Sequence, residues 1–365
     1  MGQQVRAWKC KRYAGFETSG SKREDISPLR EVLELTETSA PRCNENSVVI
    51  RNHFAGVQYP DALQAQGFYQ ERPELPYIPG VDCVGTVLEV GPSVTHVQPG
   101  DPVIGCMSIG ALAEVSAASA TRVWKLPAGI DMQKCANLSR NYFSAYHSLR
   151  VLGEVKIGQI VLVDGASGGV GLAAIQLAKA MGAKVIAGVS TEAKTRLPEQ
   201  AGADSVLVYG REKTTFQEFK KQVRQVCSEL GQPAGVDVIV DMVQGDLFEA
   251  ALLSCLRPLG RVALVGFTAG QKPIRPGMIL IKQATLMGSM WGPWSRENPD
   301  QHKQHVEEIL DFMATGKVDP IVGKVFDFDF AVRVLCFQGS VLLRCSKSSR
   351  MQPSQSITHV GLLGK

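Results

Sequence analysis

The chain has 365 residues and a mass of 39.4 kDa, which is more than a single hydrophobic core usually organises, so two domains are expected. Apolar residues make up 44% of the chain and charged residues 20%, as in an ordinary globular protein. The net charge of +4 comes without a dense cluster of Lys and Arg, so the sequence gives no indication of nucleic-acid binding.

Cysteine usage and hydropathy indicate the compartment. The nine cysteines are scattered, odd in number and form no CxxC pair, which favours a reduced compartment over a disulfide framework. No apolar run reaches the length of a transmembrane helix, so no membrane span is expected. Basic residues precede the first acid, Glu17, as in a transit peptide, but Val5–Cys10 alternates like a half-exposed strand and leaves no room for one. We therefore expect a cytoplasmic protein.

Residues 1–140 are predicted to form a β-rich domain. Short runs of apolar and β-branched residues alternate there with Pro and Gly turns. The strand candidates are Val32–Leu35, Ser47–Arg51, Cys83–Val90 and Asp101–Gly105. Helical spacing occurs in this region only near Asp61–Gln66.

A glycine-rich turn then marks a change of character. Ile160–Val163 is a run of four apolar residues, as in a strand that is buried on both faces. Gly165–Gly171 is too rich in glycine to continue the strand, and Leu172–Met181 consists largely of strong helix formers. Strand, glycine turn and helix form the phosphate-binding start of a dinucleotide fold, because the backbone approaches a pyrophosphate only where side chains are missing.

The next strand carries the signal for the type of dinucleotide. Lys184–Val189 follows at the spacing of a second parallel strand, and an NAD site would place an acidic residue near its end to bind the ribose hydroxyls. Here Ser190 stands in that place, with Lys194 nearby, and a hydroxyl and a lysine suit a phosphate dianion. We therefore predict NADPH as the cofactor. The alternative is that Ser190 caps the next helix and Lys194 is a solvated surface charge.

The region 141–290 continues with alternating strands and helices. The further strands are predicted at Ser205–Val208, Val236–Asp241, Arg261–Gly266 and Thr285–Ser289, with helices over about Lys213–Leu230 and Asp246–Leu256. Six strands with intervening helices predict an α/β fold with a doubly wound parallel sheet. Ligands bind beyond the carboxyl ends of such strands, which places Gly165, Ser190, Asp241 and Gly266 on one rim. A further helix is predicted over about His302–Thr315.

Several motifs occur in a fixed order along the chain. They are Gly56-Val57-x-Tyr59-x-Asp61, Gly67-Phe68-Tyr69, Pro76 to Asp82, Val97-x-Pro99-Gly100-Asp101-x-Val103, the Gly165 to Gly171 turn, Leu280-Ile281-Lys282 and Gly288-x-x-Trp291-Gly292. In these motifs the chain resembles the zinc-independent quinone oxidoreductases, the ζ-crystallin-like members of the medium-chain dehydrogenase/reductase superfamily, from about Val5 to Val334.

The resemblance implies a GroES-like β domain built from both ends of the chain, with a Rossmann domain inserted and the active site in the cleft between them. We accordingly expect a GroES-like substrate domain over residues 1–140, a Rossmann NADPH-binding domain over 141–290 and a return to the substrate domain over 291–335.

Zinc-dependent relatives of this fold provide a contrast. Their catalytic zinc needs a Cys, a Gly-His-Glu motif and a further Cys, and their structural zinc needs four closely spaced cysteines. The Gly-His-Glu place reads Gly80-Val81-Asp82 here, and no lobe with four cysteines exists, so we expect no metal. Without a Lewis acid to stabilise an alkoxide, a conjugated acceptor such as a quinone is a more suitable substrate than an alcohol.

The resemblance also implies site residues. Those expected to bind the cofactor are Ala166, Ser167, Gly168, Gly169, Val170 and Gly171 at the pyrophosphate, Ser190, Lys194 and Tyr209 at the 2′-phosphate, and Val265, Gly266, Phe267 and Trp291 near the nicotinamide. Those expected in the polar substrate cleft are Gln58, Asp61 and Tyr69. Gln58 departs from the Asn that is usual in relatives, and its amide could still donate a hydrogen bond to a carbonyl oxygen.

Three side chains also have plain structural explanations. Asp61 could cap the short helix that follows it, and Tyr69 could pack inside the β domain beside Phe68. His147 lies in a helical run with aromatic neighbours and is more typical of a core edge than of a catalytic site.

The sequence thus predicts an NADPH-dependent, zinc-free oxidoreductase that transfers hydride to a quinone or another α,β-unsaturated carbonyl. The alternatives are an enoyl or alkenal reductase acting on a lipid-derived substrate and a non-catalytic NADPH-binding protein. A homodimer is possible. Residues 336–365 depart from the relatives, carry no acidic residue and are expected to form a disordered tail that leaves the first domain without its closing helix and strand.

Overall fold

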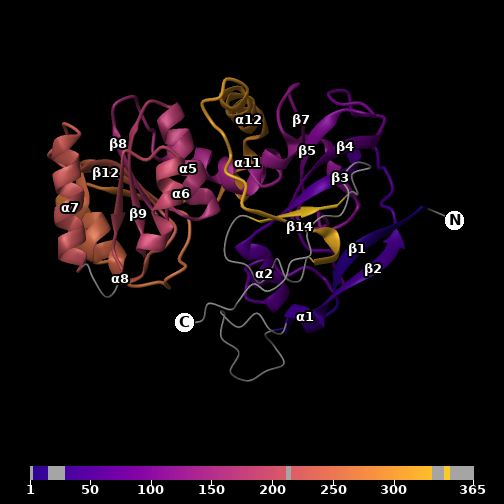
Figure 1. Cartoon of the computed structure of the whole chain (residues 1–365), viewed down its shortest axis with the longest axis horizontal. Coiled ribbons are helices and arrows are strands. Elements are labelled where there is room, and N and C mark those ends of the chain that lie inside the picture. The colour runs from indigo at the N-terminus through magenta and orange to yellow at the C-terminus, as the bar shows by residue number, and fades with distance from the viewer. Residues whose placement is uncertain (1–2, 15–28, 211–214, 331–340, 346–365) are drawn as a thin grey trace.

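Two sheets organise the chain, one in each lobe of the molecule (Figure 1). The computed structural model describes residues 3–14, 29–210, 215–330 and 341–345. A six-stranded parallel sheet lies in one lobe, and a seven-stranded sheet with an additional strand pair, β1–β2, lies in the other. The predicted combination of a GroES-like β domain with a Rossmann sheet is confirmed.

The parallel sheet has the order β10-β9-β8-β11-β12-β13. Its strands are β8 (Ile160–Asp164), β9 (Lys184–Val189), β10 (Ser205–Val208), β11 (Val236–Asp241), β12 (Leu256–Leu264) and β13 (Thr285–Gly288). The strand order reverses beside β8, so the switch point where ligands bind in such sheets lies between β8 and β11. All five residues of β8 are buried, as expected for a strand that is covered on both faces.

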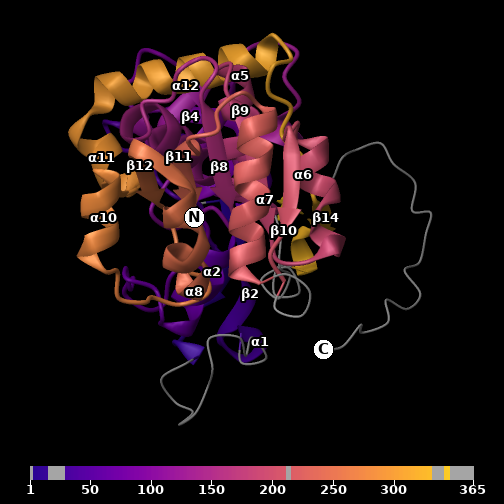
Figure 2. The ribbon, with the colours of Figure 1, turned by 90° about the vertical axis from the view of Figure 1, so that its left-hand side faces the viewer.

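Helices cover both faces of this sheet (Figure 2). They are α5 (Gly169–Ala180), η5 (Glu192–Lys194), α6 (Arg196–Gln200), α7 (Phe216–Glu229), α8 (Gly245–Leu247), η6 (Phe248–Leu252), α9 (Leu253–Cys255) and α10 (Pro276–Lys282). Val161 and Val163 of β8 pack in the same core as α5, whereas Ile160 and Leu162 share a core with α7. This alternation is the physical basis of the doubly wound arrangement.

The observed boundaries of two helices and one strand differ from the predicted ones. The helix expected from Lys213 begins at Phe216, because Thr215 and Glu218 form a capping box, with Glu218 N donating to Thr215 Oγ1 at 3.2 Å. The helix expected over Asp246–Leu256 is divided into α8, the π-helical η6 and α9. Strand β12 begins at Leu256, five residues before the predicted start at Arg261.

The other lobe is built mainly from the first part of the chain. Its elements are β1 (Gln4–Cys10), α1 (Leu29–Val32), β2 (Leu33–Ser39), β3 (Ser47–Val57), α2 (Tyr59–Gln66), β4 (Asp82–Val90), β5 (Pro102–Cys106), β6 (Val115–Ser119), η2 (Ala120–Arg122) and β7 (Val123–Lys125). The long strand β3 pairs with β4 along one edge and with β6 and β15 along the other. Every strand predicted in this region is present, and β1 matches the alternation of Val5–Cys10.

A helical segment joins the two lobes. It comprises α3 (Met132–Cys135), η3 (Leu138–Phe143), α4 (Ser144–Tyr146) and η4 (His147–Leu152), of which η3 and η4 are π-helical. After β13 the chain continues as α11 (Trp291–Glu297), α12 (Pro299–Ala314), β14 (Lys324–Asp327) and η7 (Phe328–Phe330). Phe143 and Val306 share one core with α5, so α12 and the helical segment pack together between the lobes.

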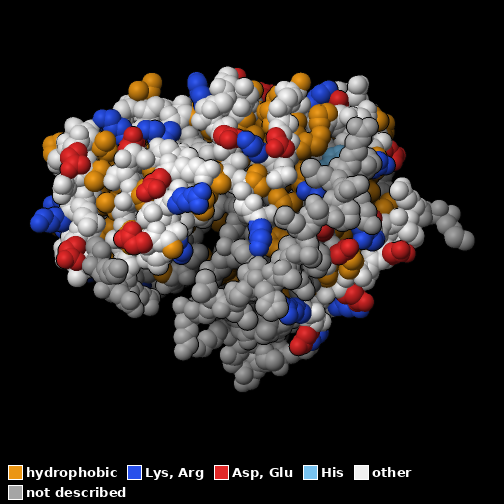
Figure 3. All heavy atoms as spheres, in the orientation of Figure 1, with side chains coloured by type: hydrophobic (Ala, Val, Ile, Leu, Met, Phe, Trp, Pro, Cys, Tyr) orange, Lys and Arg blue, Asp and Glu red, His pale blue; other side chains and the backbone are white. Residues whose placement is uncertain are grey.

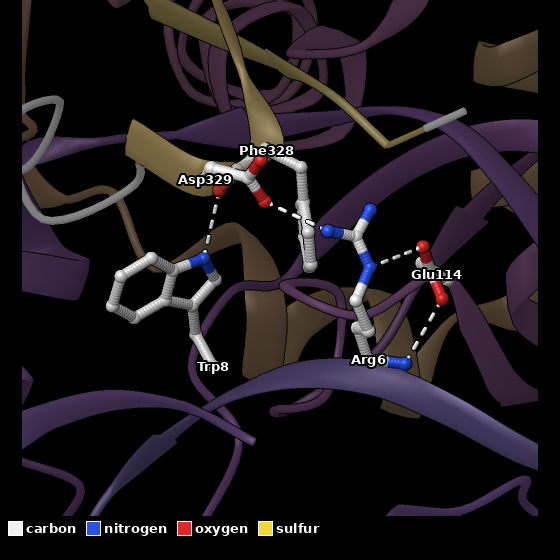
Figure 4. A network of polar contacts seen from close by, with 5 residues as sticks. All are labelled: Arg6, Trp8, Glu114, Phe328 and Asp329. Carbon is white, nitrogen blue, oxygen red and sulfur yellow. Dashed lines mark hydrogen bonds and ion pairs between the residues drawn. The ribbon is translucent and has the colours of Figure 1, made fainter. Parts of the chain in front are cut away.

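The residues after β14 dock onto the first strand of the chain (Figure 4). Trp8 Nε1 donates a hydrogen bond of 2.8 Å to the carbonyl oxygen of Phe328. Arg6 reaches Glu114 and Asp329, each at 2.8 Å. The β domain is therefore closed by a segment more than 300 residues away from β1 in sequence, as the Arg6–Asp329 separation of 323 shows.

The structure corrects the prediction for part of the tail. Val341–Arg344 form strand β15, which pairs antiparallel with β3 and parallel with β14. For these four residues the expectation of disorder, and with it the expected loss of the closing strand, is wrong. The available edge of β3 supplies the backbone partners that the local sequence pattern did not reveal. Residues 336–340 and 346–365 lie outside the described residues.

No described helix is long and apolar enough to cross a membrane. On the face shown in Figure 3, the basic and acidic side chains of the described residues are interspersed, in keeping with the small net charge.

Candidate functional site

The glycine turn lies at the carboxyl end of β8 and leads into α5. Gly165 has a φ of +75°, in the left-handed region, where side chains other than hydrogen are strained. A Cβ at Gly171 would stand 2.5 Å from the Gly165 carbonyl oxygen and 2.7 Å from Ala166 Cα, both backbone atoms. Only glycine therefore lets α5 start this close to the strand.

Gly168 has a different environment. It is the N-cap of α5, and no described side chain caps that helix. A Cβ there would meet only the Gly165 carbonyl oxygen, at an ordinary contact distance of 3.4 Å. Packing within the chain therefore does not require glycine at this position. A pyrophosphate that closely approaches the helix N-terminus would require it, because a side chain would occupy the same space. The turn fits the phosphates of a dinucleotide.

Ser190 and Lys194 stand together beyond β9. Lys194 Nζ donates a hydrogen bond of 3.1 Å to Ser190 Oγ, and Lys194 is exposed while Ser190 is half-buried. The N-cap of the following η5 is Thr191, so Ser190 is not the cap that the alternative interpretation required. The cation and the hydroxyl point at one another on the rim that also carries the glycine turn.

The other predicted cofactor residues occupy distinct environments. Tyr209 packs edge-on against Phe219, and its hydroxyl faces Asp164. Burial and the charge of Asp164 both raise the pKa of Tyr209. Val265 and Gly266 follow β12, where their backbone N–H groups donate to the Asp241 carbonyl oxygen at 2.8 and 3.3 Å. They belong to the same carboxyl edge of the sheet.

Trp291 lies deeper than the rim. It is 8% exposed, packs against Phe143 and His302, and has the Arg122 guanidinium 5.2 Å from its ring centre. Its place is an aromatic cluster between the helical segment and α11.

His147 shares this neighbourhood. Its Nδ1 lies 3.2 Å from Ser289 Oγ, its ring packs on Trp294, and burial lowers its pKa to about 4. The side chain is therefore a neutral core histidine at ordinary pH, as expected for a core edge.

Opposite the glycine turn, the first domain presents a group of polar side chains that we call the polar cluster. It consists of Gln58, Asp61, Tyr69, Asp82, Ser139 and Arg140. These residues come from α2 and its flanks, from the start of β4 and from the π-helical η3. Widened helical turns of this kind often occur at functional sites.

Asp82 is the centre of the polar cluster. Its carboxyl group accepts hydrogen bonds from Gln58 Nε2 at 3.0 Å, from the Arg140 backbone N–H at 3.2 Å and from the Ser139 hydroxyl. Burial raises its pKa to about 6, although the Ser139 hydroxyl and the charge and backbone N–H of Arg140 oppose the shift. Asp82 is therefore a carboxyl group that can hold or release a proton near neutral pH.

Arg140 supplies the positive charge of the polar cluster. Its pKa is raised: burial disfavours the cation, but the charges of Asp61 and Asp82 outweigh burial. The guanidinium also lies 5.9 Å from the centre of the Tyr69 ring. A single cation thus balances two buried carboxyl groups and adjoins the half-buried tyrosine.

The three predicted substrate residues, Gln58, Asp61 and Tyr69, all lie in this cluster. They differ in their hydrogen-bond partners. The amide nitrogen of Gln58 donates to Asp82 and, at 3.3 Å, to Asn137 Oδ1, so donation to a substrate carbonyl requires one of these bonds to break. Asp61 does not precede the helix as expected, because α2 begins at Tyr59. From the first turn of α2 it accepts a 2.8 Å hydrogen bond from the Gln58 backbone N–H, as the N3 residue of a capping box does.

A small cavity of about 20 Å³ lies beside the first turn of α5. Asn137, the partner of Gln58, lines it together with Gly169 and Leu172 of α5 and with Ile321 of the returning segment. The cavity therefore lies between the N-terminus of α5 and a neighbour of the polar cluster, and it has room for about one water molecule.

Sequence similarity identifies the chain's relatives. It is 32% identical over 327 residues to the quinone oxidoreductase-like protein 2 of Bos taurus, covering 89% of this chain and 90% of that protein. It is also 32% identical over 301 residues to the quinone oxidoreductase of Homo sapiens, covering 82% of this chain and 87% of that protein. The chain belongs to the quinone oxidoreductase family. The resemblance seen in its ordered motifs is confirmed.

Further comparisons agree with membership of this oxidoreductase family. Residues 44–128 match the alcohol dehydrogenase GroES-like domain, and residues 169–315 match the family described as zinc-binding dehydrogenase. The crystal structure of Escherichia coli quinone oxidoreductase complexed with NADPH is similar with a TM-score of 0.78 and 26% identity, covering 93% of this chain and 99% of that one. Among the described residues, no group of three or more His, Cys, Asp or Glu could hold a metal ion.

Three residues of the polar cluster were not predicted from the sequence of this chain. In the sequence, Asp82 stands out only because it occupies the place of the Glu of the zinc-dependent relatives, and no motif includes Ser139 or Arg140. Arg140 is the one Arg, Lys, Asp or Glu in the run 135–149, and this was the available signal, because a charge among packed side chains needs a partner.

Proposed function

We propose that the protein is an NADPH-dependent reductase of quinones or other α,β-unsaturated carbonyl compounds. The observation that carries the proposal is the Lys194–Ser190 pair at 3.1 Å, a cation and a hydroxyl where an NAD site would have an acid, on the same rim as the glycine turn. The complex of the Escherichia coli relative with NADPH supports the choice of cofactor.

The residues that would hold NADPH follow from the rim. The backbone from Gly168 to Gly171 receives the pyrophosphate, Ser190 and Lys194 receive the 2′-phosphate, and Val265 to Phe267 line the nicotinamide. Tyr209 lies beneath the 2′-phosphate site, and Trp291 supports the cleft from behind. When bound, NADPH supplies a hydride that a conjugated carbon of the acceptor can take.

The polar cluster would receive the acceptor. Tyr69 is half-buried and carries a hydroxyl that can orient or protonate a carbonyl oxygen if it reaches it. Arg140 places positive charge beside the site where negative charge develops on that oxygen. Asp82, with its pKa of about 6, holds Gln58 and can exchange a proton within the cluster. Asp61 fixes the start of α2 and thereby the position of Gln58.

The test is stopped-flow oxidation of NADPH with a panel of quinones and enones, including a lipid-derived alkenal and an enoyl thioester. We expect rapid turnover of quinones and simple enones. Preference for the alkenal or the thioester would instead identify the enoyl or alkenal reductase. Tight NADPH binding without turnover of any acceptor would identify a non-catalytic NADPH-binding protein and overturn the enzyme proposal.

Ser190→Asp should weaken NADPH binding by about tenfold to a hundredfold, since a carboxylate replaces a donor to the phosphate and such charged hydrogen bonds contribute about 1.5–3 kcal/mol. Fluorescence titration measures the dissociation constants for NADPH and NADH. Thr191→Asp is the matched control, because it adds the same charge at the exposed neighbour. Equal affinities of Ser190→Asp and the unaltered protein for NADPH would show that the 2′-phosphate binds elsewhere.

We also propose a homodimer formed at the open edge of the parallel sheet. Strand β13 is the last strand of that sheet, and Leu280 and Ile281 of the adjacent α10 are 78% and 72% exposed. Sedimentation velocity should give twice the mass of 39.4 kDa. Ile281→Glu should dissociate the dimer, whereas Leu197→Glu, at a less exposed leucine of α6, should not. A monomeric unaltered protein would refute this interface.

A further inference from the structure

Beneath the proposed cofactor rim lie two buried carboxyl groups for which the reaction gives no role. Asp164 ends β8 and Asp241 ends β11, and the two are direct partners in the register of these parallel strands. Both residues are fully buried. Two negative charges at adjacent buried positions repel strongly, so the pair is stable only if it retains a proton.

Hydrogen bonding indicates where the proton resides. Asp241 Oδ1 accepts from the backbone N–H groups of Val243 and Gln244 at 2.8 and 3.0 Å, whereas Asp164 Oδ1 accepts from one described backbone N–H group, that of Gly165, at 2.9 Å. More amide donors favour the charged form, so Asp241 is the carboxylate and Asp164 the acid. The remaining Oδ2 atom of each residue is buried and has no partner by hydrogen-bond geometry among the described residues. One O–H donated from Asp164 to Asp241 satisfies both.

We propose that this shared proton holds the cofactor rim together, which makes Asp164 a positioning residue for the NADPH site. The inference rests on the proposed function, since it concerns the same rim. It assigns a role to a carboxyl pair that lies below the cofactor and outside the polar cluster.

The Asp241 carboxylate holds a turn that contacts the other loops of the rim. It fixes the turn 242–245, in which Gln244 has a φ of +54° and Gly245 a φ of +63°. Val243 of this turn packs against Gly165, because a Cβ at Gly165 would lie 3.0 Å from Val243 Cγ2. The turn also pairs with the loop after β12, through Ala269 N–H to the Val243 carbonyl and Gly245 N–H to the Gly270 carbonyl, each at 3.0 Å. Loss of the proton therefore disturbs the glycine turn and the nicotinamide loop together.

Among the described residues, Tyr209 is the other titratable group that acts on the pair. Burial and the Asp241 charge raise the pKa of Asp164, and the Tyr209 hydroxyl that faces it from beyond β10 opposes the shift. Burial likewise raises the pKa of Asp241. Gly188 of β9 and Phe219 of α7, which pack beside Asp164 and Tyr209, carry no charge. Since both carboxyl pKa values are raised, the pair retains its proton to a higher pH than free carboxyl groups do and loses it as the pH rises.

The experiment is a titration of NADPH binding between about pH 7 and about pH 10, the range in which buried carboxyl groups lose their protons. In the unaltered protein, affinity should fall by up to about tenfold for each pH unit above the midpoint. Asp164→Asn keeps an amide donor to Asp241 but cannot ionise, so its affinity at neutral pH should match the unaltered protein and its alkaline loss should disappear. Asp164→Ala should bind about tenfold more weakly even at neutral pH, because it lacks the donor and leaves Asp241 unpaired.

Asp237→Asn is the matched control. Asp237 is a buried residue of the same strand, four positions earlier, and is paired with Arg257 at 2.5 Å. Its variant should retain the alkaline loss. A pH-independent affinity in the unaltered protein overturns the proposal. An alkaline loss of affinity that persists in Asp164→Asn overturns it as well.

Infrared spectroscopy of the protein without NADPH separates this inference from the proposed function. The spectrum of the unaltered protein at neutral pH, minus that of Asp164→Asn, should contain the carbonyl band of a buried carboxylic acid. If that band is present and NADPH does not bind, the proposed cofactor site is wrong while the shared proton stands. Absence of the band overturns the shared proton itself.

Discussion

Arg140→Met should lower the free energy of unfolding by about 3 kcal/mol, toward the low end of the loss seen when one partner of a buried charge pair is removed. The methionine fills a similar volume, but Asp61 and Asp82 lose the only cation that acts on both of them in the described part of the chain. Urea denaturation followed by circular dichroism measures the change.

The loss should depend on pH in a defined direction. The pKa of Asp82 is already raised by burial to about 6, so its ionised form opposes folding as the pH rises through that value. Without Arg140 the ionised form is less favourable still. The difference between the variant and the unaltered protein should therefore be larger at about pH 7.5 than at about pH 5, where buried carboxyl groups with raised pKa values are protonated.

Arg150→Met provides the control for this prediction. Arg150 lies on the same helical segment and pairs with Glu308 at a partly exposed position, so its removal should cost about 0.2–1 kcal/mol. Equal losses for the two variants would mean that Arg140 contributes only as a surface residue and that the polar cluster is not a buried charge system.

Gly171→Ala should reduce both stability and NADPH affinity. The added methyl group would stand 2.5 Å from the Gly165 carbonyl oxygen, and backbone atoms must shift to admit it. Overpacking of this kind costs about 1–3 kcal/mol of stability. Displacement of the turn from the pyrophosphate by a fraction of an ångström should weaken NADPH binding by about a hundredfold. Thermal denaturation and fluorescence titration give the two quantities.

Gly168→Ala is the informative comparison, since its methyl group meets only one ordinary contact at 3.4 Å. Its stability should stay within about 0.5 kcal/mol of the unaltered protein, while NADPH affinity falls, because the methyl group occupies the space of the phosphate. If Gly168→Ala binds NADPH normally, the pyrophosphate does not lie against this part of the turn.

Local patterns predicted most of the architecture. The buried run Ile160–Val163, the glycine turn and the helix after it appear as β8 and α5, because burial on both faces and close backbone approach leave direct marks in the sequence. The helix predicted over Asp246–Leu256 was less exact, since apolar periodicity does not reveal a π-helical turn such as η6.

Features that depend on distant partners were harder to predict. Strand β15 carries no clear local signal and exists because β3 offers an unpaired edge. Arg140 could not be connected with Asp61 and Asp82 from spacing alone, as the three residues come from separate elements. The sequence did place Asp241 on the rim beside Gly165, but the pairing of Asp241 with Asp164 needs the order of the strands and their register.

The segment that closes the β domain also determines when this domain can be completed. Strand β3 receives its neighbour β15 from residues 341–344, almost 300 positions later, and β1 is held by Phe328 and Asp329. The parallel sheet, by contrast, lies within residues 160–288. During synthesis on the ribosome, the second domain therefore has all of its strands while the first still lacks an edge strand. The lobe that is made first therefore completes its sheet after the other lobe, and the part of the β3 edge that β15 covers, residues 54–57, lacks this partner strand until residues 341–344 have been made.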